Sequence, residues 1–170
     1  MKFIIPSNLL LSQLSQISGV IVSKPVLPIL ENFLFDIKNG ELTISATDLE
    51  TSMSTKLPVE AKEDIKVAIP SRLTMDILRQ LADQPLTFTV NEENFSVEMS
   101  TSSGRYKLAG QNAADFPQMP EVQSEKSFEV TSSILSRAIN KTIFAAGNDE
   151  LRPVMSGVFF QFSSQSLTFV

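Results

Sequence analysis

The chain has 170 residues with no cysteine and no histidine, which excludes disulfides, thiolate metal sites and the commonest pairs of a nucleophile and a base. Its hydrophobic share of 42% is ample for one folded domain and part of a second. No apolar run reaches the roughly 18 residues that a membrane helix needs, and Pro6 interrupts the N-terminal apolar residues before they could form a secretory signal. We therefore expect a cytoplasmic protein that makes no membrane contact and holds no cofactor.

The first part of the chain predicts a strand, a helix and a hairpin, in that order. A short apolar strand after Lys2 is broken at Pro6-Ser7, and apolar residues then recur at helical spacing. Apolar and polar residues next alternate on both sides of the turn Asn39-Gly40, which is typical of a hairpin with one buried face. The expected elements are a helix over residues 7–18, hairpin strands over 33–37 and 42–46, and a long strand over 47–57.

A second copy of this pattern begins at Lys66. Its helix follows Pro70-Ser71, and we expect Ser71 to cap the helix because its hydroxyl can accept a hydrogen bond from a free amide of the first turn. The apolar face of this helix is expected to consist of Leu73, Ile77, Leu78 and Leu81. The expected elements are a strand over residues 66–69, a helix over 71–81, hairpin strands over 86–90 and 95–99, and a strand over 105–109.

A third copy begins at Ser127, so the copies start at intervals of roughly 60 residues, and this regularity indicates an internal repeat. Its expected elements are a helix over 132–144 and hairpin strands over 158–162 and 167–169. Residues 111–126 are rich in Asn, Asp, Pro and Gln, which is typical of a linker. We therefore expect a first domain over residues 1–122 and the first part of a second domain over 123–170. Because the third copy lacks the strand that follows the other hairpins, we expect the chain to be the N-terminal fragment of a longer repeat protein.

The net charge of −5 argues against a nucleic-acid partner, whereas the distribution of the charges argues for one. Most acids lie on expected strands and turns, while the expected helices are basic. The helix charges are Arg72, Arg79, Arg137 and Lys141, against Asp76. If the helices share one layer, that layer is basic and the sheet layer is acidic. The alternative, that these few charges are simply solvated, stays open at this point.

One pair of side chains suggests catalysis. Asp48 and Glu50 lie two residues apart on the expected strand over 47–57, so they would point to one face and could bind a metal or share a proton. A solvated strand end is the simpler interpretation, because no histidine or further carboxylate is placed nearby and no glycine-rich phosphate loop occurs. We expect no catalytic residue and no metal site. The alternatives are a carboxylate-dependent hydrolase and a β-rich adhesion or ligand-binding scaffold without DNA contact.

Several ordered motifs resemble the bacterial sliding clamp family, the beta subunit of DNA polymerase III. These motifs are Met1-Lys2-Phe3, Lys24-Pro25 with Leu27-Pro28-Ile29-Leu30, Ala46-Thr47-Asp48-Leu49-Glu50, Ala113-Ala114-Asp115-Phe116-Pro117, and Arg152-Pro153 with Ser156-Gly157. The resemblance implies an α+β DNA clamp fold, in which repeated strand–helix–antiparallel-strand units place helices in one layer and sheets in the other. It also implies a head-to-tail homodimeric ring that encircles double-stranded DNA without reading its sequence. Such a ring tethers the replicative polymerase as a processivity factor and is not an enzyme.

The resemblance also implies roles for particular residues. The DNA-facing residues are expected to be Lys24, Arg72, Arg79, Arg137, Lys141, Asn148 and Arg152. The edge strand Arg105, Tyr106, Lys107 and Leu108 is expected at the dimer interface, near the second helix. In this family a cleft receives the polymerase catalytic subunit and the clamp loader. Met155 is the one residue of this chain that matches a position of that cleft, most of which lies outside this chain. Pro153-Val154 stand where relatives carry aromatic residues.

Overall fold

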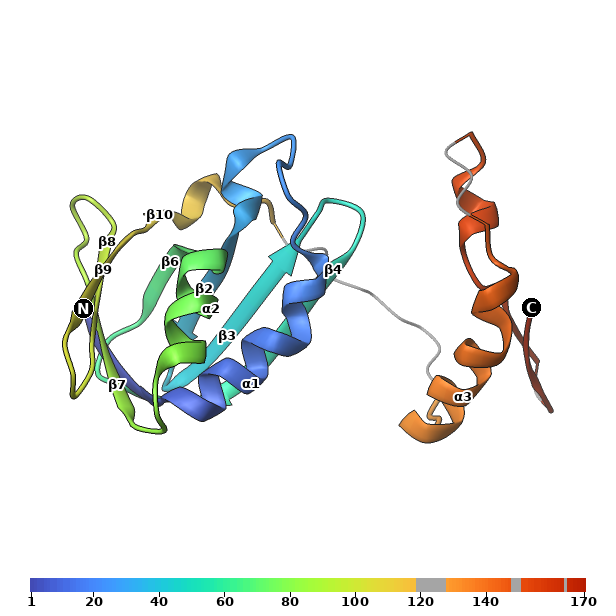
Figure 1. Ribbon diagram of the computed structural model, residues 1–170, viewed down its shortest axis with the longest axis horizontal. Helices are drawn as coiled ribbons and strands as arrows, with labels where there is room; N and C mark the ends of the chain where they lie inside the picture. Colours follow the sequence, from blue (N-terminus) through green and yellow to red (C-terminus); the bar gives the residue numbers. More distant parts are fainter. Residues whose placement is uncertain (119–127, 148–150, 164) are drawn as a thin grey trace. The chain divides into compact units, whose positions relative to one another are not determined.

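The computed structural model describes residues 1–118, 128–147, 151–163 and 165–170 (Figure 1). The chain divides into two compact units, Met1–Glu121 and Val122–Val170, which we describe separately. In the described part of the chain, every helix is too short or too polar to cross a membrane.

Unit 1 contains the same succession of elements twice, which confirms the predicted repeat. The first copy consists of β1 (Lys2–Pro6), α1 (Ser7–Ile17), β2 (Asn32–Lys38), β3 (Glu41–Thr47), β4 (Ser52–Pro58) and β5 (Glu60–Ala61). The second copy consists of β6 (Ile65–Pro70), α2 (Ser71–Gln80), β7 (Pro85–Val90), β8 (Ser96–Ser100), β9 (Arg105–Ala109) and β10 (Gln111–Asn112). Short 3-10 turns lie at η1 (Ser18–Val20), η2 (Pro28–Glu31) and η3 (Ala113–Asp115).

The two copies exchange their leading strands. One sheet has the order β5-β1-β7-β8-β9 and the other has the order β10-β6-β2-β3-β4. Strand β1 therefore pairs antiparallel with β7 of the second copy, and β6 pairs antiparallel with β2 of the first copy. The hydrophobic pattern predicted these strands but not this exchange, because alternation shows which residues are buried and not which strand is the partner.

The core of unit 1 lies between the two sheets and the two helices, which lie side by side (Figure 1). At its centre the rings of Phe3 and Phe88 stack with centroids 4.8 Å apart and an interplanar angle of 3°. Phe35 lies against both rings at 6.3 and 6.4 Å. These three fully buried rings come from both sheets, so they join the two copies into one core.

The start of α2 differs from the prediction, because Pro70 occupies its N-cap position and no side chain caps the helix. Ser71 is the first helical residue, and its hydroxyl donates to the backbone carbonyl of Glu31 at 2.5 Å. Ser7 plays the same part in α1, where its hydroxyl donates to the backbone carbonyl of Ala82 at 3.1 Å and also accepts from the amide of Gln84 at 3.0 Å. Each serine thus ties its helix to the segment before a hairpin of the other copy.

The predicted apolar face of α2 is wrong at Leu73, whose side chain is 47% exposed. The helix instead buries Thr74, Met75 and Leu78, while Ile77 is half-buried. The buried face of α2 is therefore rotated about the helix axis relative to the predicted face. The cause is that Thr74 and Met75 pack into the core, where the leucines and isoleucine alone had been expected.

The predicted strand over residues 47–57 is interrupted by a turn over residues 48–51. The Asp48 carboxylate accepts hydrogen bonds from the amides of Glu50 at 3.0 Å and Thr51 at 2.6 Å. Leu49, between them, has a positive φ of 82°. Asp48 and Glu50 are thus turn residues, and the expectation that they share a strand face is wrong.

The predicted hairpins of unit 1 are confirmed. Asn39 and Gly40 join β2 to β3 with φ values of 51° and 78°. Two successive positive φ values define the turn type whose twist matches that of paired strands, and Asn-Gly is the pair that adopts it most readily.

Unit 2 contains α3 (Ser132–Thr142), η4 (Ile143–Ala145), η5 (Pro153–Ser156) and the hairpin of β11 (Phe160–Phe162) and β12 (Leu167–Phe169). The helix and the hairpin of the third copy are confirmed, although the end of the predicted helix is the 3-10 turn η4. Residues 128–130, which stand before α3 as β1 and β6 stand before their helices, do not form a strand. The described residues of α3 are exposed or half-buried.

Candidate nucleic-acid interface

A charged stripe follows the exposed side of α2. Arg72, Asp76 and Arg79 are spaced four and three residues apart, so they share one face of the helix. All three are exposed, and the Nη1 atom of Arg79 lies 3.4 Å from an oxygen of Asp76. Within the described residues Arg72 forms no ion pair. The stripe therefore presents one free guanidinium and one that is partly neutralised.

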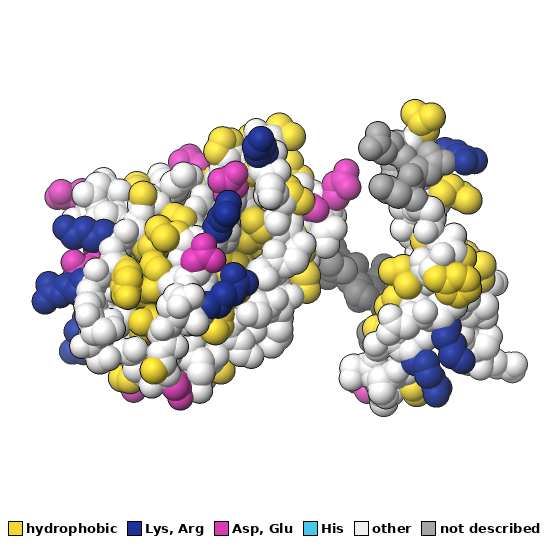
Figure 2. Space-filling view, in the orientation of Figure 1, with side chains coloured by type: hydrophobic (Ala, Val, Ile, Leu, Met, Phe, Trp, Pro, Cys, Tyr) yellow, Lys and Arg dark blue, Asp and Glu magenta, His cyan; other side chains and the backbone are white. Residues whose placement is uncertain are grey.

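Helix α1, which packs beside α2, carries no charged residue. Its exposed side chains are those of Asn8, Ser12, Ser15 and Gln16. Figure 2 shows Lys and Arg side chains on the face that carries these helices, with a few acidic side chains among them. The basic character of this helical layer therefore comes from α2.

Lys24 lies in the loop between η1 and η2, is exposed, and has a positive φ of 60°. A non-glycine residue seldom adopts this left-handed conformation. Val26, two residues later, is 90% exposed. The loop therefore holds an ammonium group beside apolar side chains that face solvent.

In unit 2, Arg137 and Lys141 lie one turn apart on α3 and are both exposed. Figure 2 shows two neighbouring Lys and Arg side chains over this helix. Arg152 is exposed directly before η5, whereas Asn148 lies outside the described residues. The structure thus places Arg137 and Lys141 side by side.

The residues expected at the dimer interface and in the peptide cleft lie on β9 and in η5. Arg105, Tyr106, Lys107 and Leu108 lie on β9, which is an edge strand of its sheet. Arg105 reaches Glu98 at 3.7 Å, and Leu108 is buried in the core. In unit 2, Met155 lies in η5 and is 54% exposed.

In the described part of the chain, Asp48 and Glu50 belong to a turn. Among the residues that the structure describes, no group of three or more His, Cys, Asp or Glu side chains is arranged to hold a metal ion. One oxygen of Asp48 accepts two amide hydrogen bonds within its turn. Asp48 therefore acts as a turn residue, as asparagine and aspartate often do.

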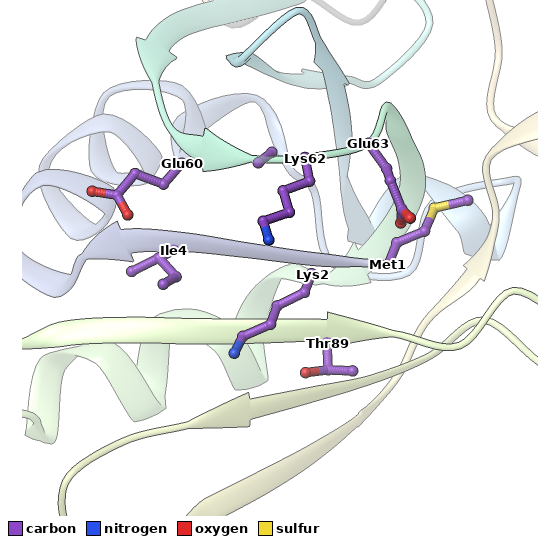
Figure 3. Close-up of a pocket in the computed structure, with 8 residues that line it drawn as sticks. Met1, Lys2, Ile4, Glu60, Lys62, Glu63 and Thr89 are labelled. Carbon is purple, nitrogen blue, oxygen red and sulfur yellow. The ribbon is translucent and has the colours of Figure 1, made fainter.

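Sequence reasoning missed two pockets of unit 1, with volumes of about 530 and 580 Å³. The first lies over β1 and β5 and is lined by Met1, Lys2, Ile4, Glu60, Ala61, Lys62, Glu63 and Thr89 (Figure 3). These residues come from three separate segments, so no local motif marks the pocket. Side chains alternate between the two faces of a strand, so the outward residues of each strand can be read from the sequence. Together with the pairing of the strands, they would have located the pocket.

The sequence profile of the DNA polymerase III beta subunit, N-terminal domain, matches residues 1–120. The chain belongs to this family. A beta sliding clamp from Vibrio cholerae is 32% identical over 168 residues, which are 98% of this chain and 46% of that relative. A beta sliding clamp from Escherichia coli is 31% identical over 168 residues, with the same coverage. A beta sliding clamp of Vibrio harveyi is 37% identical over 147 residues, 85% of this chain and all of that relative.

Solved structures of this beta subunit family share the fold. The DNA polymerase III subunit beta from Pseudomonas aeruginosa has a TM-score of 0.90 at 28% identity, covering 98% of this chain and 45% of that one. The DNA polymerase sliding clamp from Bacillus subtilis has a TM-score of 0.93 at 19% identity, covering 99% of this chain and 46% of that one. The chain has the α+β clamp fold and spans about half the length of most curated relatives that it matches.

Proposed function

We propose that this chain is the DNA-facing N-terminal part of a sliding clamp, a non-catalytic factor that encircles duplex DNA and tethers the replicative DNA polymerase III. Residues 1–122 form the first clamp domain in this proposal, and residues 123–170 form the first part of the second. Membership of the beta subunit family supports the assignment. The observation that carries DNA contact is the exposed stripe Arg72–Asp76–Arg79 on a chain whose net charge is −5.

The proposed DNA-facing residues within the described part are exposed: Lys24, Arg72, Arg79, Arg137, Lys141 and Arg152. They contact phosphates and read no base edges, because a clamp that moves along DNA needs many equivalent, shallow positions. A neutral α1 beside a weakly basic α2 suits this role, since few neutralised phosphates mean weak binding. The acidic sheet residues disfavour DNA on the outer surface.

The proposed protein partners use other surfaces. The β9 edge, which carries Arg105, Tyr106, Lys107 and Leu108, forms the interface of a head-to-tail homodimer in the full-length protein. An edge strand suits this role because its backbone groups are free to pair with another chain. Met155 forms part of the cleft for the polymerase catalytic subunit and the clamp loader, and its exposed side chain supports that role.

A salt titration with duplex DNA tests the proposal. We expect binding of this chain to two unrelated sequences to be equal, with a Kd of about 10⁻⁴ M or weaker at physiological salt. The substitutions Arg72→Gln and Lys141→Gln should each reduce the slope of log K against log salt by about 0.9, because each removes one phosphate contact. Lys24→Gln should act in the same way.

Lys56→Gln is the matched control, because Lys56 lies on β4 and pairs with Glu41 at 2.9 Å. This variant should leave the slope unchanged. Strong preference for one sequence, or an affinity that does not respond to salt, would show that the helix bases are not a phosphate-facing set. A β-rich scaffold without DNA contact predicts that second result.

A further inference from the structure

Unit 2 matches the first copy of unit 1 position by position. Helix α3 begins at Ser132 as α1 begins at Ser7, and Phe160 lies in β11 as Phe35 lies in β2. The turn η5 stands before β11 as η2 stands before β2. The spacing between equivalent residues is the same at each of these places, so the two copies align without a gap. Unit 1 therefore shows what covers each surface of such a copy.

Surfaces that are buried in unit 1 are exposed in unit 2. Phe3 is 0% exposed, whereas Phe128, its equivalent, is 58% exposed. Ile37 is 1% exposed, whereas Phe162, its equivalent, is 51% exposed. Helix α1 buries four residues, whereas no described residue of α3 is buried. Unit 2 thus presents an apolar face over α3 and β11, and an exposed face of this kind is typical of a site of association.

In unit 1 this face is covered by the other copy of the repeat. Phe3 of β1 is paired with Phe88 of β7, and Val67 of β6 is paired with Phe35 of β2. The two pairs occupy equivalent positions, so each copy places its leading strand on the hairpin of the other in the same register. Helices α1 and α2 lie side by side in this arrangement (Figure 1). A second copy of the repeat is therefore the surface that the apolar face fits.

The backbone of β11 is also open on the side where a leading strand would lie. Within residues 128–147, 151–163 and 165–170, β11 pairs only with β12. In unit 1 the equivalent strands β2 and β7 each have a hairpin partner on one side and a leading strand on the other. An unpaired edge beside an apolar face favours pairing with another chain.

We propose that two copies of this chain associate through unit 2, each placing residues 128–130 against β11 of the other. The register of unit 1 then pairs Phe128 with Phe160 of the second chain, and Glu129 with Phe159 of the second chain. The two α3 helices lie side by side, as α1 and α2 do. Both chains use the same patch, so the association closes at two chains. This interface is separate from the proposed β9 interface and does not rest on the proposed function.

The charges of α3 stay outside this interface. Arg137 and Lys141 correspond to Ser12 and Gln16 of α1, which are exposed in unit 1 although α2 packs beside α1. Association therefore buries the apolar side of α3 and leaves its guanidinium and ammonium groups in water, where they cost no desolvation.

Sedimentation velocity of the full chain over a wide range of concentration tests the proposal. We expect the mass to rise with concentration from 18.7 kDa towards twice that value. The key variant is Ile139→Asp, because Ile139 corresponds to Leu14, which is 0% exposed in unit 1. This change should weaken association about tenfold or more, since it would bury an unpaired carboxylate. Asn140→Asp adds the same charge at the neighbouring exposed position and should leave association unchanged.

Cross-linking tests the register without any change on α3. The chain has no cysteine, so single cysteines can be introduced without competing thiols. A mixture of Glu129→Cys and Phe159→Cys chains should form a disulfide between these two positions on oxidation, because directly paired residues lie within disulfide reach. A mixture of Glu129→Cys and Thr168→Cys chains is the control, since Thr168 lies on β12. Its mixed cross-link, identified by peptide mass spectrometry, should be at least about fivefold less abundant.

Circular dichroism of each variant establishes that the fold is retained, and the cross-linking result decides the question if Ile139→Asp does not fold. A mass of 18.7 kDa at every concentration would overturn the proposal. Equal effects of Ile139→Asp and Asn140→Asp, or equal cross-linking in the two mixtures, would also overturn it. A dimer that is lost in Tyr106→Asp and retained in Ile139→Asp would assign the association to β9, against the proposal.

Discussion

The hydroxyl of Ser71 donates a hydrogen bond to the backbone carbonyl of Glu31, which lies 40 residues earlier in the chain. The bond joins the first turn of α2 to the segment before β2, and Ser71 is only 6% exposed. We expect Ser71→Ala to lower the free energy of unfolding by about 1 kcal/mol, measured by urea denaturation, because the carbonyl loses its donor. Ser12→Ala, at an exposed position of α1, should change it by less than about 0.5 kcal/mol. Equal effects of the two changes would refute the role assigned to Ser71.

The position of the buried stripe on α2 gives a second prediction. Met75 is 4% exposed and Leu73 is 47% exposed. We expect Met75→Ala to lower the free energy of unfolding by about 2 to 5 kcal/mol, because it opens a cavity in the core. Leu73→Ala should cost less than about 1 kcal/mol. The opposite order would mean that the leucine faces the core after all.

Gly110 connects β9 of one sheet to β10 of the other, where the chain passes close to its neighbours. A Cβ atom there would lie 2.3 Å from the carbonyl oxygen of Phe95 and 3.2 Å from that of Ala68. Since both atoms belong to backbone, Gly110→Ala should lower the free energy of unfolding by about 1 to 3 kcal/mol. A Cβ on Gly104 would meet nothing within 4 Å. Gly104→Ala is therefore the control and should be close to neutral by chemical denaturation.

Asp76 moderates the charge of the helical layer through its contact with Arg79. Asp76→Asn should raise the affinity for duplex DNA by about two- to fivefold at low salt, because an exposed ion pair of this kind is worth at most about 1 kcal/mol. Glu41→Gln makes the same change of charge on β3 and should have little effect. An unchanged or lowered affinity of Asp76→Asn would argue against DNA contact by α2.

Local patterns predicted the elements of unit 1 well. The hairpins were predicted because alternation and the Asn39-Gly40 turn are properties of neighbouring residues. The interruption at Asp48 was missed, because its carboxylate bonds to amides within a stretch that otherwise resembles a strand. The role of Ser71 was missed because its hydrogen-bond partner is distant in sequence.

The candidate DNA-facing residues Arg72, Arg79, Arg137 and Lys141 were proposed because the expected helices are basic, whereas Lys24, Asn148 and Arg152 were proposed from the family resemblance. The pocket over β1 was not found, since it depends on the pairing of Lys2 with Thr89. Pairing between strands far apart in the chain is set by the packing of the whole core, and hydrophobic alternation alone does not identify the partner.

The exchange of β1 and β6 has a consequence for the order in which the chain folds. A single copy on its own would leave its hairpin sheet without the strand that the other copy supplies, whereas two separate identical chains could close the same arrangement by swapping strands. The exchange therefore makes each copy depend on the other for a complete sheet. We also expect it to delay completion of the fold, because the terminal amine of Met1 bonds to the carbonyl of Val90, 89 residues away, and such distant pairings form slowly.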